Sequence, residues 1–197
     1  MTDRVSDDVL RQLFLDARTH NAWQQKDVPD AMLHEIIDLM KMGPTSANCL
    51  PARVVFVKSA AAKNRLAPFL SSANRPKTMD APVCAIIGND MQFYEHLPRL
   101  FPHNLTARTW FEGNAAVIEA TAMRNGSLQG AYLMLAARSL GLDCGPMSGF
   151  DAAGVDKEFF PDGRVKTNFI CNLGYGDPAG LFPRSPRFAF DEIAKVV

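Results

Sequence analysis

The spacing of apolar residues predicts three amphipathic helices. The first covers residues 7–17, with Val9, Leu10, Leu13 and Phe14 on one face. The second begins near Pro29, a residue that suits a helix start, and its apolar face is Met32, Leu33, Ile36, Ile37 and Met40. The third and longest covers residues 115–140. These helices account for much of the apolar content of the chain.

Shorter apolar runs between the helices predict strands. Four runs qualify, at residues 53–58, 82–88, 142–147 and 169–174. An alanine-rich segment covers residues 60–69, and the aromatic-rich residues 91–112 are expected to form short helices broken at Pro98 and Pro102. Helices interleaved with a few strands indicate a layered α/β or α+β domain.

The composition indicates one globular domain over residues 1–197. The chain is 47% hydrophobic, and its 21 basic residues balance 21 acidic ones. This balance argues against nucleic acid or an anionic membrane as a partner. The N-terminal 20 residues lack the apolar stretch of a signal peptide, and the four cysteines form no Cys-x-x-Cys pair, so we expect a cytoplasmic protein with reduced thiols. Histidine spacing gives no support for a metal site.

The helix predicted at residues 115–140 is apolar around much of its circumference, as expected of a buried helix. Its middle carries Gly126, Ser127, Gly130 and Ala131, small residues that would permit the close approach of another helix. A domain of this size rarely buries a helix of this length alone. We therefore expect a homodimer.

A polar loop at residues 43–53 is the first candidate for ligand binding. It places Thr45, Ser46 and Asn48 between Pro44 and Pro51, whose rings fix the backbone φ angle and stiffen the loop. Hydroxyl and amide groups on a stiff loop can hydrogen-bond a polar ligand without burying charge. Ordinary turn chemistry between a helix and a strand explains the same residues equally well.

The segment Gly-Leu-Asp-Cys-Gly-Pro-Met-Ser-Gly-Phe, residues 141–150, is a second candidate, since backbone amides beside glycine can donate to a ligand atom that accumulates charge. A turn before a helix at Asp151 is the alternative. Basic residues that could hold a phosphate are Arg18, Lys77, Arg184 and Arg187, although for any one of them taken alone a solvated surface charge is the favoured explanation. The signatures of Rossmann, P-loop and nucleophile-elbow sites are absent from the sequence.

Four separated segments together resemble the flavin-dependent nitroreductase family. They are Ala-Arg-Thr-His-Asn-Ala-Trp (17–23), Pro-Thr-Ser-Ala-Asn-Cys-Leu-Pro (44–51), the segment 141–150, and Pro-Arg-Ser-Pro-Arg (183–187). The similarity extends over nearly the whole chain, and the fuller strings resemble the malonic semialdehyde reductases, also called 3-hydroxypropionate dehydrogenases, of pyrimidine catabolism. The resemblance implies an α+β three-layer fold, with a mixed, mostly antiparallel sheet flanked by helices, and an intertwined homodimer with FMN sites at the interface.

The resemblance also implies roles for particular residues. Arg18, Thr19 and Asn21 would approach the phosphate, ribityl chain and ring edge of FMN, and Asn74 and Lys77 would lie near the ribityl chain and pyrimidine edge. The flavin ring would be bordered by Thr45, Ser46 and Asn48 and would lie against Pro146, Met147, Ser148 and Gly149, with a backbone amide near Ser148 facing N5. Arg184 and Arg187 would hold the phosphate.

Two departures from the family pattern affect the expected substrate. Many nitroreductases have Gln and Trp where this chain has Leu50 and Ala52, and many have Glu at the position of Ser148. We therefore expect reduction of malonic semialdehyde to 3-hydroxypropionate, with NADPH or NADH as donor, and Arg108 is a speculative ligand for the substrate carboxylate. The alternatives are a broad quinone or nitro-compound reductase and a non-catalytic flavin-binding dimer. No side chain is identified as the catalytic acid.

Overall fold

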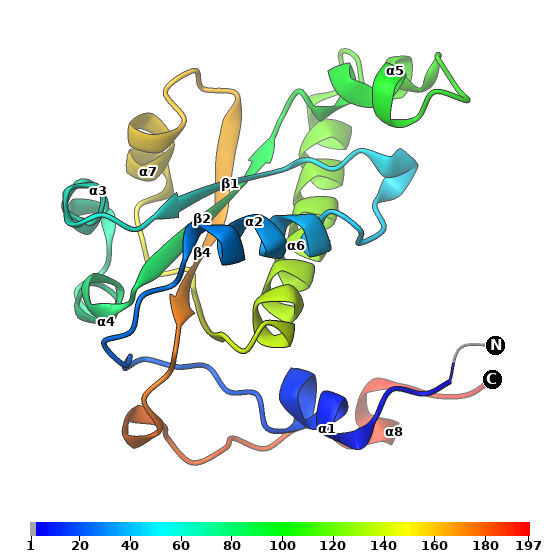
Figure 1. The fold of residues 1–197 in the computed structure, drawn as a ribbon. Coiled ribbons are helices and arrows are strands. Elements are labelled where there is room, and N and C mark those ends of the chain that lie inside the picture. Colours follow the sequence, from blue (N-terminus) through cyan, green and yellow to red (C-terminus); the bar gives the residue numbers. More distant parts are fainter. Residues whose placement is uncertain (1–2) are drawn as a thin grey trace.

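The computed structural model describes residues 3–197 and contains one four-stranded sheet with the order β1-β2-β4-β3 (Figure 1). The strands are β1 (Ala52–Val57), β2 (Val83–Asp90), β3 (Asp143–Met147) and β4 (Val165–Gly174). Each neighbouring pair is antiparallel. A single parallel bridge, Thr19 to Cys144, adds the N-terminal segment beside β3. The predicted α+β class and mostly antiparallel sheet are confirmed.

Helices cover both faces of the sheet. On one side lie α2 (Asp30–Met40) and α6 (Ala115–Ser139), and on the other lie α3 (Ala60–Leu66), α4 (Arg75–Asp80) and α7 (Ala152–Phe159) (Figure 1). Side chains alternate along the fully buried β2, so that Ala85 and Ile87 join the core under α2 and α6, whereas Ile86 faces the opposite core. This arrangement is the three-layer architecture that the resemblance implied.

Three short helices lie outside these layers: α1 (Asp7–Leu10), α5 (Leu97–Leu100) and α8 (Phe190–Ile193). The prediction of a helix over residues 7–17 was wrong in its extent, because the α-helix stops at Leu10 and Arg11–Leu15 form a π-helical turn. Its apolar face is not buried against this chain, and Phe14 is 53% exposed. The helical spacing of apolar residues in the segment 7–17 therefore did not indicate a long helix of the hydrophobic core.

Two other boundaries differ from the prediction for identifiable reasons. Strand β4 begins at Val165 rather than Phe169, because its first half carries polar residues that an apolar-run criterion overlooks. Pro98 does not break a helix. It lies in the first turn of α5, where a missing backbone N–H removes no intrahelical hydrogen bond.

Helix α6 ends within one residue of the predicted boundary. Its glycines, however, pack against the sheet rather than against another helix. A side chain at Gly126 would overlap Asn89 of β2, and one at Gly130 would overlap the Phe169 ring of β4. The glycines therefore bring α6 close to the sheet within this chain. The expectation that they accommodate another helix was wrong for these two positions.

A buried carboxylate anchors the aromatic-rich residues 91–112 to the sheet. Asp90, at the end of β2, accepts from Arg53 Nη2 at 2.5 Å and from Arg164 Nε at 2.7 Å. Arg164 also pairs with Glu95 at 3.2 Å, within the anchored segment. Burial alone would raise the pKa of Asp90, but hydrogen bonds from Arg164 and the Gln92 amide, together with the arginine charges, lower it overall.

Candidate functional site

An apolar pocket of about 400 Å³ lies where β3 ends beside α6. Three of its lining residues belong to the predicted flavin-facing segment, namely Pro146, Met147 and Ser148. The opposite wall comes from α6 and β4 and consists of Ser127, Ala131, Met134 and Phe169. No titratable side chain is among these lining residues, so the pocket itself offers no acid or base for proton transfer.

The backbone that follows the pocket is held by Asn74, a residue that the resemblance implied would lie near the ribityl chain of FMN. Asn74 Nδ2 donates to the Gly149 carbonyl at 2.9 Å, and the Ser71 amide donates to the same oxygen at 3.1 Å. A Cβ atom at Gly149 would lie 2.7 Å from Asn74 Nδ2. Glycine is therefore the residue that permits this close approach.

The predicted N-terminal cofactor segment, residues 17–23, lies beside the edge strand β3. Its strand-like contact begins at the Thr19 bridge to Cys144, and the His20 amide donates to the Cys144 carbonyl at 3.0 Å. Lys77 Nζ then donates to Asn21 Oδ1 at 3.1 Å, which links this segment to α4. Hydrogen bonds therefore link the predicted segments at residues 19–21, 74–77 and 146–149 along β3, from Cys144 near its start to the residues that follow its end.

The two chain ends bring a fourth predicted segment to this neighbourhood. Arg18 Nη2 donates to the Phe182 carbonyl at 2.5 Å, and Arg184 Nη2 donates to the Leu15 and Ala17 carbonyls at 2.7 and 3.2 Å. The guanidinium groups of Arg18 and Arg184 thus join the C-terminal segment to the N-terminal one, and each has further N–H groups available to an anion. Arg187 instead donates to the neighbouring Ser185 and Pro186 carbonyls.

The loop with Thr45, Ser46 and Asn48 packs on α6 and α5 rather than on the end of β3. The Ser46 amide donates to Asn125 Oδ1 at 2.8 Å, and Asn48 Nδ2 donates to the Leu100 carbonyl at 2.8 Å. The side chains of Ser46 and Asn48 are exposed. Among residues 3–197 of a single chain, we observe no contact between the loop that carries Thr45, Ser46 and Asn48 and the other segments predicted to bind the cofactor.

Arg108 lies in a 3₁₀ turn of the aromatic-rich segment and is paired with Glu112 at 2.6 Å. Both side chains are about half exposed. The structure does not bring Arg108 to the pocket at β3. Its assignment as a substrate ligand remains a prediction.

Sequence reasoning assigned no role to His20, within the predicted segment 17–23, or to Asp143, the first residue of β3. His20 Nε2 is 3.3 Å from Asp143 Oδ1, and Asp143 Oδ2 accepts from the Gly176 amide at 2.9 Å. Nδ1 of the buried His20 has no hydrogen-bond partner among the described residues. The tertiary contact between residue 20 and the start of β3 is not visible in local sequence patterns, so only the structure identifies this pair.

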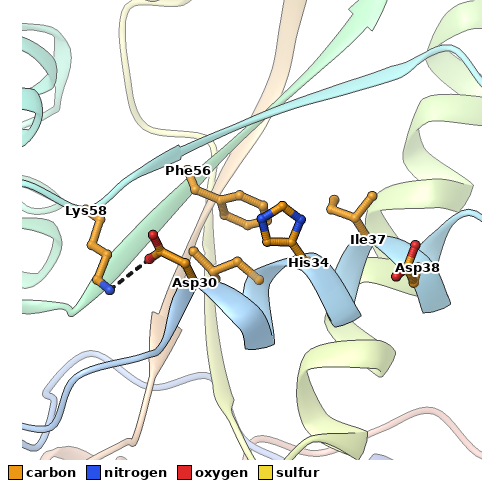
Figure 2. Close-up of a pocket in the computed structure, with 7 residues that line it drawn as sticks. Asp30, His34, Ile37, Asp38, Phe56 and Lys58 are labelled. Atoms are coloured by element: carbon orange, nitrogen blue, oxygen red, sulfur yellow. Dashed lines mark hydrogen bonds and ion pairs between the residues drawn. The ribbon is translucent and has the colours of Figure 1, made fainter.

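A second groove, of about 410 Å³, separates α2 from the edge strand β1 (Figure 2). Its apolar floor includes Ile37 and Phe56, and Lys58 pairs with Asp30 at 3.0 Å along its rim. No residue predicted to bind cofactor lines it. Over residues 3–197 no cluster of histidine, cysteine and carboxylate side chains is suited to holding a metal ion, and no helix within that range has the length and apolar character to cross a membrane.

Known proteins resemble this chain in both sequence and fold. A Burkholderia lata protein named "Putative NADH dehydrogenase/NAD(P)H nitroreductase" is 68% identical over 192 residues, covering 98% of each chain. A Ralstonia pickettii protein with the same descriptive name is 58% identical over 194 residues, covering 98% of this chain and 97% of the relative.

Solved structures share the fold at low sequence identity. A Bacillus subtilis nitroreductase-like structure superposes with a TM-score of 0.88 at 19% identity, covering 98% of this chain and all of that one. An Exiguobacterium sibiricum structure in complex with FMN superposes with a TM-score of 0.85 at 19% identity, covering the whole of both chains. The sequence profile described as "Nitroreductase family" matches residues 15–175. The chain therefore belongs to the nitroreductase family.

Proposed function

We propose that this protein is an FMN-dependent oxidoreductase that uses NADPH or NADH to reduce a small acid-aldehyde, malonic semialdehyde, to 3-hydroxypropionate. The observation that carries the proposal is the set of hydrogen bonds that links the predicted residues Asn21 and Lys77 to one another and Asn74 to the backbone at Gly149, directly after the apolar pocket at the end of β3. The names of the relatives, which include NAD(P)H, and the FMN complex of a structural neighbour support the same chemistry.

The residues around the pocket fit the parts of FMN. Arg18 and Arg184 supply guanidinium groups beside the chain ends, where planar, charge-assisted hydrogen bonds suit a phosphate. Asn21 and Lys77 are hydrogen-bonded to one another and would exchange that contact for the polar edge of the ligand. Pro146, Met147 and Ser148 offer a mostly apolar wall for a flat ring.

When bound, FMN would supply hydride transfer between the nicotinamide and the aldehyde, chemistry that protein side chains do not perform. The chain itself would orient the ring through the backbone near Ser148 and exclude water with the apolar wall of α6 and Phe169. Because no acid or base lines the pocket, the proton that completes the alcohol would come from solvent or from a ribityl hydroxyl.

The substrate assignment rests on the resemblance of the fuller sequence strings to the malonic semialdehyde reductases, and the departures in the polar loop agree with it. Leu50 and Ala52 stand where many relatives have Gln and Trp, so the ligand space above the ring differs from that of a general nitroreductase. Arg108 would bind the carboxylate of the aldehyde, and to do so it would have to leave Glu112. A broad quinone or nitro-compound reductase is the second candidate, which the names of the relatives favour.

We also infer a homodimer in which the partner supplies the polar loop to the pocket. Large apolar side chains remain exposed on α6 and along the C-terminal segment; they include Met123, Leu128, Phe182, Phe188 and Phe190. A subunit interface would cover such exposed apolar side chains. The four cysteines are buried and free, which agrees with a reducing, cytoplasmic location.

The absorption spectrum of the purified protein, reconstituted with FMN and then mixed anaerobically with NADPH or NADH, tests the cofactor and the donor together. We expect a flavin spectrum that bleaches on reduction and recovers on addition of malonic semialdehyde. A protein that binds no FMN, or whose flavin neither donor bleaches, contradicts the proposal. Recovery with oxygen alone would favour the non-catalytic flavin-binding dimer.

The ratio of kcat/KM for malonic semialdehyde to that for a quinone then separates the two enzymatic functions, because this ratio measures discrimination between competing substrates. We expect the aldehyde to be preferred. Preference for the quinone would favour the broad reductase.

A further inference from the structure

The polar loop at residues 45–50 has a backbone conformation that its own sequence disfavours. Ala47 and Asn48 both have φ of 49°, and Leu50 has φ of 39°. These angles lie in the left-handed region, which residues other than glycine rarely adopt, and Leu50 is an especially unfavourable residue there. Such conformations persist only where the surroundings hold them, and they concentrate at functional sites.

Two buried amide side chains of α6 hold this loop from beneath. Asn125 Oδ1 accepts from the Ser46 amide, and Gln129 Oε1 accepts from the Ala52 amide, each at 2.8 Å. Asn125 is 1% exposed and Gln129 is 2% exposed. They lie four residues apart on one face of the helix and therefore contact the loop at its beginning and its end.

Contacts within the loop complete this support. Leu50 is held on both sides, because its amide donates to Thr45 Oγ1 at 3.2 Å and its carbonyl accepts from Arg53 Nη1 at 3.1 Å. The Cys49 side chain is fully buried beneath the loop. The side chains of Ser46 and Asn48, in contrast, are exposed, and Asn48 donates to the Leu100 carbonyl of α5 rather than to these anchors.

We propose that Asn125 and Gln129 are positioning residues that hold the strained loop 45–50 in the conformation that binds FMN before the cofactor arrives. This inference rests on the proposed function, in which Thr45, Ser46 and Asn48 border the flavin. A loop with fewer anchors would occupy the competent conformation for less of the time, and the apparent affinity for FMN falls in proportion to that fraction.

The test compares FMN dissociation constants, measured by fluorescence titration of apo protein, for wild type and two variants of Gln129. Gln129→Met keeps the side-chain length but removes the acceptor, so we expect the FMN Kd to rise about tenfold. Gln129→Glu keeps an acceptor oxygen for the Ala52 amide and is expected to remain within about threefold of wild type.

Thr167→Val is the matched control for lost stability. It removes a side-chain hydrogen bond of 2.5 Å to Asp156, on the opposite side of the sheet from this loop. We expect a lower melting temperature with an unchanged FMN Kd. If Gln129→Met lowers the melting temperature but leaves the Kd within twofold of wild type, Gln129 is a structural residue only and the inference is overturned.

Hydrogen exchange of the wild-type apo protein tests the same inference without any variant. We expect the Ser46 and Ala52 amides to exchange slowly before FMN is added. Rapid exchange that becomes slow only with FMN would show that the cofactor, not α6, orders the loop. Wild type that binds no FMN at all would instead contradict the proposed function, whereas slow exchange of these amides would still show that α6 orders the loop.

Discussion

At the scale of single residues, one carboxylate joins the sheet to the segment that follows it. Asp90 is 1% exposed and accepts from two arginines, and its pKa is below the ordinary aspartate value. A carboxylate whose folded pKa is depressed contributes stability above its unfolded pKa of about 4, and this contribution is lost as the pH falls through the folded pKa.

Asp90→Asn should therefore destabilise the protein by about 3 kcal/mol at pH 7, because it leaves Arg53 and Arg164 near an uncharged partner. Urea unfolding at pH 7 and at successively lower pH checks the prediction. The difference between wild type and variant should shrink as the pH falls below about 4. A difference that does not change with pH would contradict it.

Gly149 permits the contact between Asn74 and the backbone beside the pocket. Gly149→Ala would place a Cβ atom 2.7 Å from Asn74 Nδ2, so either the side chain or the backbone must move. We expect FMN to bind at least tenfold more weakly, as measured by fluorescence titration. Ser148→Ala is the neighbouring control, and it should leave affinity within about threefold if the flavin contact there uses only the backbone.

At the scale of elements, most of the architecture could be predicted from the sequence, because buried strands and the long α6 carry strong apolar patterns. The hydrogen bonds of the buried amide side chains of α6 could not be predicted, because the sequence around Asn125 and Gln129 does not show which backbone groups they contact. A regular polar spacing at residues 121, 125 and 129 within a buried helix was the available signal. The candidate site was predicted through four matching segments, of which the tertiary structure links three and leaves the loop at residues 44–51 apart from them within one chain.

The exposed face of α6 gives the element-scale prediction. Leu128 is 45% exposed and lies on the helix surface directed away from the sheet. Leu128→Glu should shift the protein from dimer to monomer in light scattering, because it places a charge in an apolar interface, and should leave far-ultraviolet circular dichroism unchanged. Glu119→Gln, on an exposed part of the same helix, is the control. A Leu128→Glu variant that stays dimeric would exclude this face as the interface.

At the scale of the whole molecule, hydrogen bonds of two arginines join a segment near the start of the chain to one near its end. The contacts of Arg18 with Phe182 and of Arg184 with Leu15 and Ala17 join residues more than 160 positions apart. The proposed phosphate site thus depends on complete folding of the chain rather than on one local motif.

The double variant Arg184→Ala/Arg187→Ala tests this phosphate assignment. We expect FMN affinity to fall about a hundredfold, which corresponds to about 2.7 kcal/mol, since each charge-assisted hydrogen bond contributes about 1.5–3 kcal/mol. Arg65→Ala is a control that removes a positive charge paired with Glu158, away from the site. Titration with FMN measures both, and unchanged affinity in the double variant would rule out these arginines as phosphate ligands.

Strand β1 lies at one edge of the sheet, with β2 as its only neighbour among the named strands. Its apolar run, Val54–Val57, would make this edge a template for intermolecular strand pairing and aggregation. Charged residues at both ends, Arg53 and Lys58, are the kind that natural edge strands use against such pairing. In the folded protein Lys58, which pairs with Asp27 and Asp30, therefore places charge beside the edge at which two copies of this chain would otherwise be able to pair as strands.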